Sequence, residues 1–204
     1  MHAETTGVAG MPSKLARLEE RHVAALNGLV RQLRTTGGSP RVVPWADPDS
    51  GGVDARVLVL FESPANLTVS AGASAFSSED NENATSRSFA AARIEAGMTR
   101  RDYLRWNVVP WPLFDAAGVR RPPNADDLDE AQPALAAVIE LMPGLSSIVT
   151  FGATALTAVM RYYTLHDHPV IVPVLAAPHP SPANGHRRGE NHVRAVNALR
   201  RSLP

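Results

Sequence analysis

The chain has 204 residues, of which 44% are hydrophobic and 20% are charged, so it can fold around an ordinary hydrophobic core. Its formal net charge is zero, so no global field attracts nucleic acid, and any such binding must come from local patches. Cysteine is absent, which excludes disulfides, thiolate zinc sites and cysteine-held iron–sulfur clusters and suits a cytosolic protein. No apolar run approaches membrane-spanning length, and the N-terminus lacks the apolar core of a signal peptide, so we expect neither a membrane anchor nor a leader.

The N-terminal quarter is predicted to hold one helix between a tail and a loop. Residues 1–12 are small and polar and are expected to form a flexible tail. A leucine stripe predicts an amphipathic helix from Ser13 to Arg34, in which His22 is expected to pack rather than to bind a ligand. Thr35 to Asp54 is rich in Gly, Pro, Asp and Ser, which indicates a connecting loop.

Strand and helix patterns alternate through the rest of the chain. Short apolar runs bounded by turn residues are typical of buried strands, and the stretches between them have helical periodicity. This alternation indicates parallel pairing with helices on both faces. We therefore predict one domain over 1–204, a three-layer α/β/α sandwich with a central four-stranded, mostly parallel sheet. The predicted strands are Arg56–Glu62, Tyr103–Val109, Ser147–Phe151 and Val170–Leu175, and the helices are Thr85–Gly97, Leu128–Met142, the segment after Gly152 and His186–Leu203.

Polar side chains follow the predicted strands. Glu62 and Ser63 end the first strand, Asn107 lies near the end of the second, and His179 follows the fourth. Because ligand sites of open α/β sheets form at the carboxyl ends of the strands, these side chains should converge. An amide near the end of a buried strand is costly unless paired, so Asn107 either bonds neighbouring backbone or reads the edge of a planar heterocycle.

Two loops should frame this edge of the sheet. In Ala176–Asn191, two prolines bracket Ser181 and exclude a helix, which indicates either a polar surface turn or a rigid ligand loop. Asn66–Thr85 is long and polar, and loops of that length are usually functional or disordered. Its aromatic residue, Phe76, either anchors the loop or stacks on a ligand.

Other common sites lack support. There is no G-x-G-x-x-G after the first strand, no P-loop and no G-x-S-x-G elbow, so dinucleotide, P-loop and hydrolase-triad sites are not predicted. His166-Asp167-His168 gives poor tetrahedral geometry without a third ligand, and we predict no metal site.

Four stretches resemble, in order, the motifs of the uracil-DNA glycosylase superfamily, over roughly residues 56 to 200. F-E-S-P-A at 61–65 resembles the first motif, which reads G-E-A-P-G in the thermophilic family and G-Q-D-P-Y in the common bacterial one. W-N-V-V-P-W with the later R-R-P-P-N resembles N-V-V-x-C-R-P-P-x-N of the second strand. V-T-F-G-A-T-A resembles the third-strand turn, and H-P-S-P-A-N the final motif.

The resemblance implies a role for each matching position. Asn107 would hydrogen-bond the pyrimidine edge, and His179 would donate to the uracil O2 as negative charge builds on the leaving base. Phe76 would stack on the flipped base, which offsets part of the cost of extracting it. The residues implied to pinch the DNA backbone and enter the duplex are Ser181, Pro182, Asn184, Arg187 and Arg188.

The sequence also departs from the family pattern. Ser63 stands at the position of the water-activating Asp of the common family, and a neutral hydroxyl is no general base by itself, although the thermophilic-type family has Ala there. Glu62 or Asp80 would then activate water or stabilise the oxocarbenium ion. The missing cysteines rule out the iron–sulfur cluster of the thermophilic-type family, so no cofactor is expected. Ala65 replaces the Tyr that blocks the thymine methyl in the strictest enzymes, which implies a wider base range.

Three hypotheses follow. The first is a monofunctional glycosylase of base-excision repair that hydrolyses the N-glycosidic bond of uracil or another deaminated base in DNA. It would act as a metal-free monomer in the bacterial cytosol or nucleoid. The second is a catalytically inert DNA-binding member, because Ser63 lacks a basic group. The third is a hydrolase of free nucleosides or nucleotides.

Overall fold

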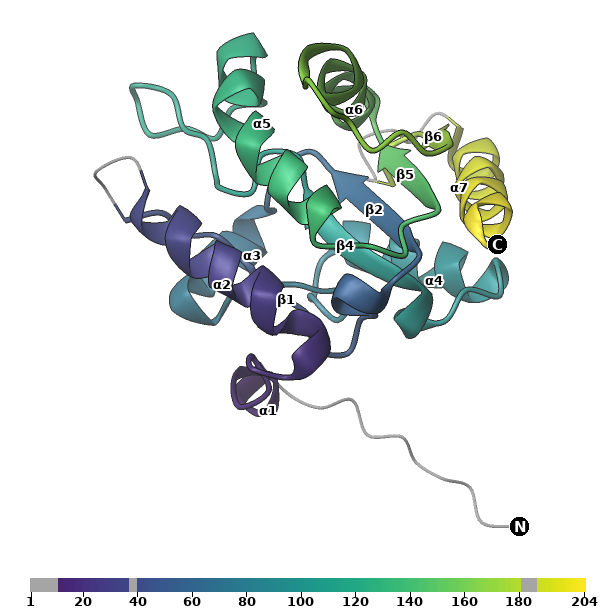
Figure 1. The fold of residues 1–204 in the computed structure, drawn as a ribbon, viewed down its shortest axis with the longest axis horizontal. Helices are drawn as coiled ribbons and strands as arrows, with labels where there is room; N and C mark the ends of the chain where they lie inside the picture. Colours follow the sequence, from purple (N-terminus) through teal and green to yellow (C-terminus); the bar gives the residue numbers. More distant parts are fainter. Residues whose placement is uncertain (1–10, 37–39, 181–186) are drawn as a thin grey trace.

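The fold is built on a parallel sheet of four strands in the order β4-β2-β5-β6. The structure, a computed structural model, describes residues 11–36, 40–180 and 187–204 (Figure 1). The central strand β2 pairs with both β4 and β5, with Phe61 opposite Asn107 and Leu60 opposite Thr150. The strands are β2 Val57–Phe61, β4 Tyr103–Asn107, β5 Ser147–Phe151 and β6 Val174–Ala177.

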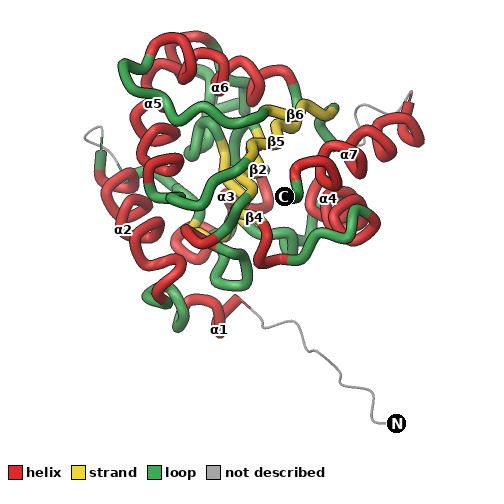
Figure 2. Tube along the Cα trace, turned by 45° about the vertical axis from the view of Figure 1, so that its right-hand side comes forward, coloured by secondary structure: helices red, strands yellow, loops and turns green. Residues whose placement is uncertain are grey.

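Helices cover both faces of this sheet, which explains why β2 is apolar at every position. Val57, Val59 and Phe61 belong to the hydrophobic cluster packed against α4 and α7, whereas Leu58 and Leu60 face α2, α5 and α6. Figure 2 shows the strands between these two helical layers. The predicted three-layer α/β/α sandwich is therefore confirmed. The covering helices are α2 Arg21–Thr35, α4 Ala84–Glu95, α5 Ala125–Glu140, α6 Ala153–Leu165 and α7 Arg188–Ser202.

The N-terminal helix differs from its prediction. The single helix expected from Ser13 to Arg34 is divided into α1 (Met11–Leu15) and α2, with a turn between them. Lys14 lies within α1, and its buried ammonium contacts Asp47 (2.8 Å) and Asp80 (2.6 Å), residues far away along the chain. Leucine periodicity carries no information about such contacts. Residues 1–10 of the predicted tail lie outside the described residues, whereas 11 and 12 belong to α1.

Two segments predicted as loops contain short regular elements. Strand β1 (Trp45–Ala46) pairs in parallel with β3 (Phe76–Ser77), so the two predicted loops are joined by a small sheet. Helix α3 (Asn66–Ser70) lies within the second of these loops. Because the pairing is non-local, neither segment shows a strand pattern by itself. Single 3₁₀ turns lie at Gly52–Asp54, Gly72–Ser74 and Arg100–Asp102.

The last strand lies further along the chain than predicted. The apolar run Val170–Leu175 was expected to form it, but β6 spans Val174–Ala177 and pairs with β5 alone. Val170 and Ile171 are exposed instead. Pro173 has no amide hydrogen, and only its carbonyl joins the ladder, accepting from the Ile148 amide at 2.9 Å. Within the described residues, no helix combines the length and the apolar character needed to cross a membrane.

Candidate functional site

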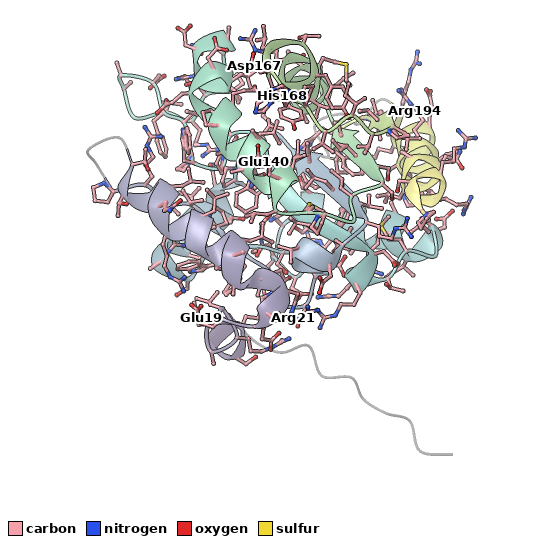
Figure 3. All side chains as sticks on the ribbon, viewed as in Figure 1. Glu19, Arg21, Glu140, Asp167, His168 and Arg194 are labelled. Carbon is pink, nitrogen blue, oxygen red and sulfur yellow. The ribbon has the colours of Figure 1, made fainter. Side chains whose placement is uncertain are left out.

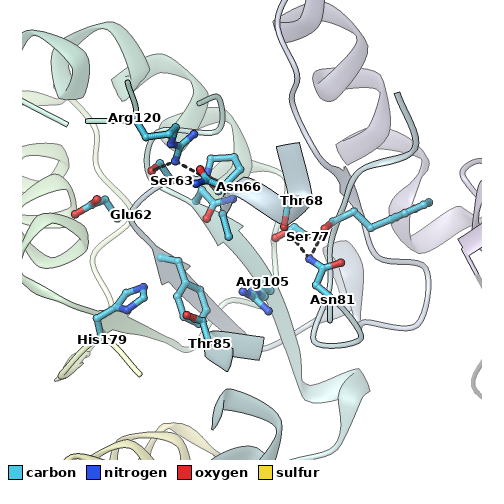
Figure 4. Close-up of a pocket in the computed structure, with 15 residues that line it drawn as sticks. Glu62, Ser63, Asn66, Thr68, Ser77, Asn81, Thr85, Arg105, Arg120 and His179 are labelled. Carbon is cyan, nitrogen blue, oxygen red and sulfur yellow. Dashed lines mark hydrogen bonds between the residues drawn. The ribbon is translucent and has the colours of Figure 1, made fainter. Parts of the chain in front are cut away.

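The carboxyl ends of β2, β4 and β6 meet at a cavity of about 200 Å³ (Figure 4). Five of the predicted site residues line it, although they come from separate parts of the chain. This is the edge at which parallel topology was expected to collect them. The five residues are Glu62, Ser63, Phe76, Asn107 and His179.

Asn107 is the last residue of β4 and is held beside β2. The amides of Val108 and Val109 donate to the carbonyls of Phe61 (2.8 Å) and Glu62 (3.0 Å), which continues the pairing past the strand end. Asn107 is 8% exposed, and its side chain has no hydrogen-bond partner among the described residues. Of the two alternatives for Asn107, a bond to neighbouring backbone is not made among the described residues, and a buried amide without a partner is unfavourable. Its donor and acceptor are available to a molecule in the cavity.

Glu62 follows β2 at the wall of the cavity. One carboxylate oxygen accepts a 2.7 Å hydrogen bond from the Thr154 hydroxyl in the first turn of α6. The partial positive charge of a helix N-terminus stabilises a carboxylate in this place. Gly152 precedes this helix with φ 96°, a conformation that side chains rarely adopt. The glycine thus permits the sharp turn that brings α6 to Glu62.

His179 follows β6 and packs edge-on against the Phe61 ring, with the ring centroids 5.8 Å apart. Burial lowers the pKa of His179 below its usual 6.5, and the nearby Glu62 charge offsets this only in part. The imidazole is therefore neutral at pH 7. A neutral imidazole has one N–H donor and one acceptor nitrogen.

Phe76 anchors its loop in the core and also lines the cavity. It is 1% exposed and belongs to the main hydrophobic cluster, so it anchors the loop through β3. It also contributes to the cavity lining, and its carbonyl accepts from the Asn81 side chain at 2.9 Å. Stacking on a base stays a prediction.

Asp80 is not brought to the cavity. Its carboxylate accepts hydrogen bonds from both terminal nitrogens of Arg100 and from Lys14 at 2.6 Å. The Arg100 hydrogen bond is the largest influence holding the pKa of Asp80 far below its usual value, with Lys14 acting in the same direction. With its oxygens engaged elsewhere, Asp80 is a poor candidate for water activation.

One group of acidic side chains has the spacing of metal ligands. Within the described residues, Asp47, Asp49 and Asp80 form the one group of carboxylate or imidazole ligands close enough to share an ion. The Lys14 ammonium already lies against all three, at 2.6 to 3.2 Å. Figure 3 shows Asp167 and His168 on the turn after α6, outside this group.

The predicted DNA-gripping residues divide into two sets. Ser181, Pro182 and Asn184 lie outside the described residues. Arg187 and Arg188 are exposed at the start of α7, where Arg187 lies 3.4 Å from Glu190. Their contact with DNA stays a prediction.

Sequence reasoning missed two arginines that line the cavity, Arg105 and Arg120. Arg105 interrupts an apolar strand two residues before Asn107, so the two-residue period of a strand could have placed both on one face. Arg120 donates to the Ser63 hydroxyl (3.2 Å) and the Pro64 carbonyl (2.6 Å). Burial lowers the pKa of Arg120, and among the described residues its other terminal nitrogen is buried without a hydrogen-bond partner.

Comparisons with known proteins agree with this fold. A search of curated proteins found no match. A solved structure, wild-type SMUG2 from Pedobacter heparinus, is similar with a TM-score of 0.52 and 10% identity, covering 72% of this chain and 74% of that one. At this identity the likeness concerns the fold alone. The sequence model of the uracil DNA glycosylase superfamily matches residues 48–200, which is most of the chain. The chain therefore belongs to the uracil DNA glycosylase superfamily, as its four motifs predicted.

Proposed function

We propose that this protein is a monofunctional DNA glycosylase that hydrolyses the N-glycosidic bond of uracil or a related deaminated base in DNA. The observation that carries the proposal is the convergence of Glu62, Asn107 and His179 on one cavity. A carboxylate, an amide and a neutral imidazole are the groups this hydrolysis needs. The cavity is concave, part apolar and part polar, as small-ligand sites are.

Base recognition would begin with extrusion of the nucleotide. Removing a base from the stack costs a few kcal/mol, which contacts inside the pocket must offset. The unpartnered amide of Asn107 would pair with the hydrogen-bonding edge of the base. His179 would donate to a carbonyl oxygen, where negative charge collects as the bond weakens.

Bond cleavage would follow with water as the nucleophile. The C1′–N bond breaks and its electron pair leaves with the base nitrogen, while the water oxygen forms a bond to C1′. Glu62 would accept a proton from this water, and one proton finally reaches the base nitrogen. The products are the free base and an abasic site.

Glu62 is the carboxylate we assign to water activation. It is the acidic residue among the cavity-lining residues that the structure describes, and Thr154 orients it. Ser63 is a neutral hydroxyl already bound by Arg120. These contacts favour Glu62 over the other candidates, Ser63 and Asp80.

Substrate and product can be measured directly. Duplex and single-stranded oligonucleotides containing uracil, hypoxanthine or xanthine would be incubated with the protein, and abasic sites revealed by alkaline cleavage. Asn107→Ala and His179→Ala should each abolish excision while the thermal unfolding curve stays cooperative. His168→Ala, an exposed imidazole away from the cavity, is the matched control. Normal cleavage by both cavity variants would refute the mechanism.

A second function is favoured by Ser63, which stands where the common family has its general base. An inert member would bind duplex DNA and leave no abasic product. The same oligonucleotides in a binding assay separate this outcome from glycosylase activity. Turnover of free deoxyuridine with indifference to DNA would instead identify a nucleoside hydrolase.

A further inference from the structure

Arg105 places a guanidinium in the cavity that the mechanism above does not use. It is the third residue of β4, and the two-residue period of a strand puts it on the same face as Asn107. The residue is 9% exposed, and it lines the cavity. Figure 4 shows the Arg105 side chain between Thr85 and Asn81, across the pocket from Glu62.

Neutral groups hold this guanidinium. One terminal nitrogen donates to the Ser78 carbonyl (2.8 Å) and the Ser86 hydroxyl (2.9 Å). The guanidinium carbon lies 4.4 Å from the Phe61 ring centroid, a distance typical of a cation–π contact. These contacts orient the planar group without neutralising its charge.

The charge has no direct counterion. No carboxylate lies within ion-pair distance of Arg105 among the described residues, and its Nε and second terminal nitrogen have no hydrogen-bond partner there. Burial lowers the pKa of Arg105 to about 10, so it is still charged at neutral pH. A buried cation without an anionic partner is costly, and that cost falls when a ligand brings negative charge.

We propose that Arg105 binds a carbonyl oxygen of the extruded base and stabilises the negative charge that this base acquires as the C1′–N bond breaks. The inference rests on the proposed function and narrows its substrates to bases that turn a carbonyl oxygen toward this wall. An amino group there would leave the guanidinium donors unpaired. A well-placed hydrogen-bonding pair favours the matching base over the mismatched one by on the order of 10- to 100-fold.

The first test measures how much the enzyme depends on the leaving group. Single-turnover excision of uracil is compared with that of 5-fluorouracil, whose anion is the more stable. Arg105→Met should slow uracil excision by about 10- to 100-fold, within the range for loss of one oxyanion donor. It should slow 5-fluorouracil excision much less, so the ratio of the 5-fluorouracil rate to the uracil rate rises. Arg105→Lys, which keeps the charge, should restore much of the uracil rate.

A matched control separates this effect from loss of structure. Arg93 is also largely buried, on α4, but it pairs with Glu79 and does not line the cavity. Arg93→Met should lower the melting temperature without changing the ratio of the two excision rates. An unchanged ratio in Arg105→Met, or the same change in both methionine variants, overturns the inference.

The second test needs no turnover. Affinity is measured for a duplex carrying non-cleavable 2′-fluoroarabino-uridine and for the same duplex with a tetrahydrofuran site, which lacks a base. Wild-type protein should prefer the base-containing duplex, and Arg105→Met should lose most of that preference. If Arg105→Met loses the preference but the wild-type protein excises no base, the glycosylase proposal is refuted and the base-binding role of Arg105 is supported. An equal preference in the variant would refute that role even if the wild type is active.

Discussion

Replacing each of two carboxylates by its isosteric amide tests which one activates water. Glu62→Gln removes the one acid assigned to the cavity and keeps the size of the side chain. General acid–base catalysis contributes about 10²- to 10⁴-fold, so kcat for uracil excision should fall by that amount. The variant should stay folded, because an amide oxygen can still accept the hydrogen bond from Thr154.

Asp80→Asn should lower the stability of the protein and leave its excision rate nearly unchanged. Asp80 forms ion pairs with Lys14 and Arg100. Its side chain is 20% exposed, so these ion pairs are intermediate between surface ion pairs and fully buried ones. Surface pairs contribute about 0 to 1 kcal/mol and breaking a buried pair costs about 3 to 5, so we expect a loss of about 1 to 3 kcal/mol. For a chain of this length, that corresponds to a fall of roughly 2 to 12 °C in Tm. The excision rate at 25 °C should be nearly unchanged.

Pairing scanning calorimetry with single-turnover excision separates the two roles. Because the pKa of Asp80 is lowered in the folded state, its stabilisation is present above the unfolded value near 3.8 and is lost as pH falls below it. The Tm gap between wild type and Asp80→Asn should therefore close in acid. Loss of activity in Asp80→Asn at normal Tm, or full activity in Glu62→Gln, would refute the assignment.

Three further outcomes are expected. The His179 imidazole should titrate below pH 6.5 in an NMR experiment assigned with His179→Gln, since burial lowers its pKa; a midpoint above 6.5 would contradict this. The double variant Arg187→Gln, Arg188→Gln should weaken duplex binding and reduce the salt slope by about 0.9 for each phosphate that is no longer neutralised, with the rate at saturation unchanged. Gly152→Ala should lower stability by about 1 to 2 kcal/mol, because its φ of 96° strains any side chain, and a neutral result in urea unfolding would show that the turn relaxes.

Local sequence patterns were sufficient for three of the four strands of the main sheet and for the family. Val57–Phe61 could be recognised as a central strand because a segment buried on both faces must be apolar throughout. The parallel direction of the strands followed from the alternation of strands and helices. It predicted that Glu62, Asn107 and His179 would meet at one edge of the sheet, and the cavity brings them together there.

Pairing between distant segments was decided only in three dimensions. The small sheet of β1 and β3 joins residues 45–46 to 76–77, and neither segment has a pattern of its own long enough to predict it. The ammonium of Lys14, in α1, lies among carboxylates from two later loops. Asp80 belongs to this cluster and does not line the cavity, although the acidic side chain of Asp80 made it a plausible catalytic group.

Whether the Arg105 guanidinium in the cavity has a carboxylate partner also depended on tertiary structure. The sequence by itself determined that an Arg interrupts β4 two residues before Asn107, and hence that both could share a face. Only packing decided that no carboxylate reaches Arg105 among the described residues, and that Ser78, Ser86 and Phe61 hold it instead. A strand pattern determines the face on which a side chain lies, whereas its counterions come from segments that folding brings beside it.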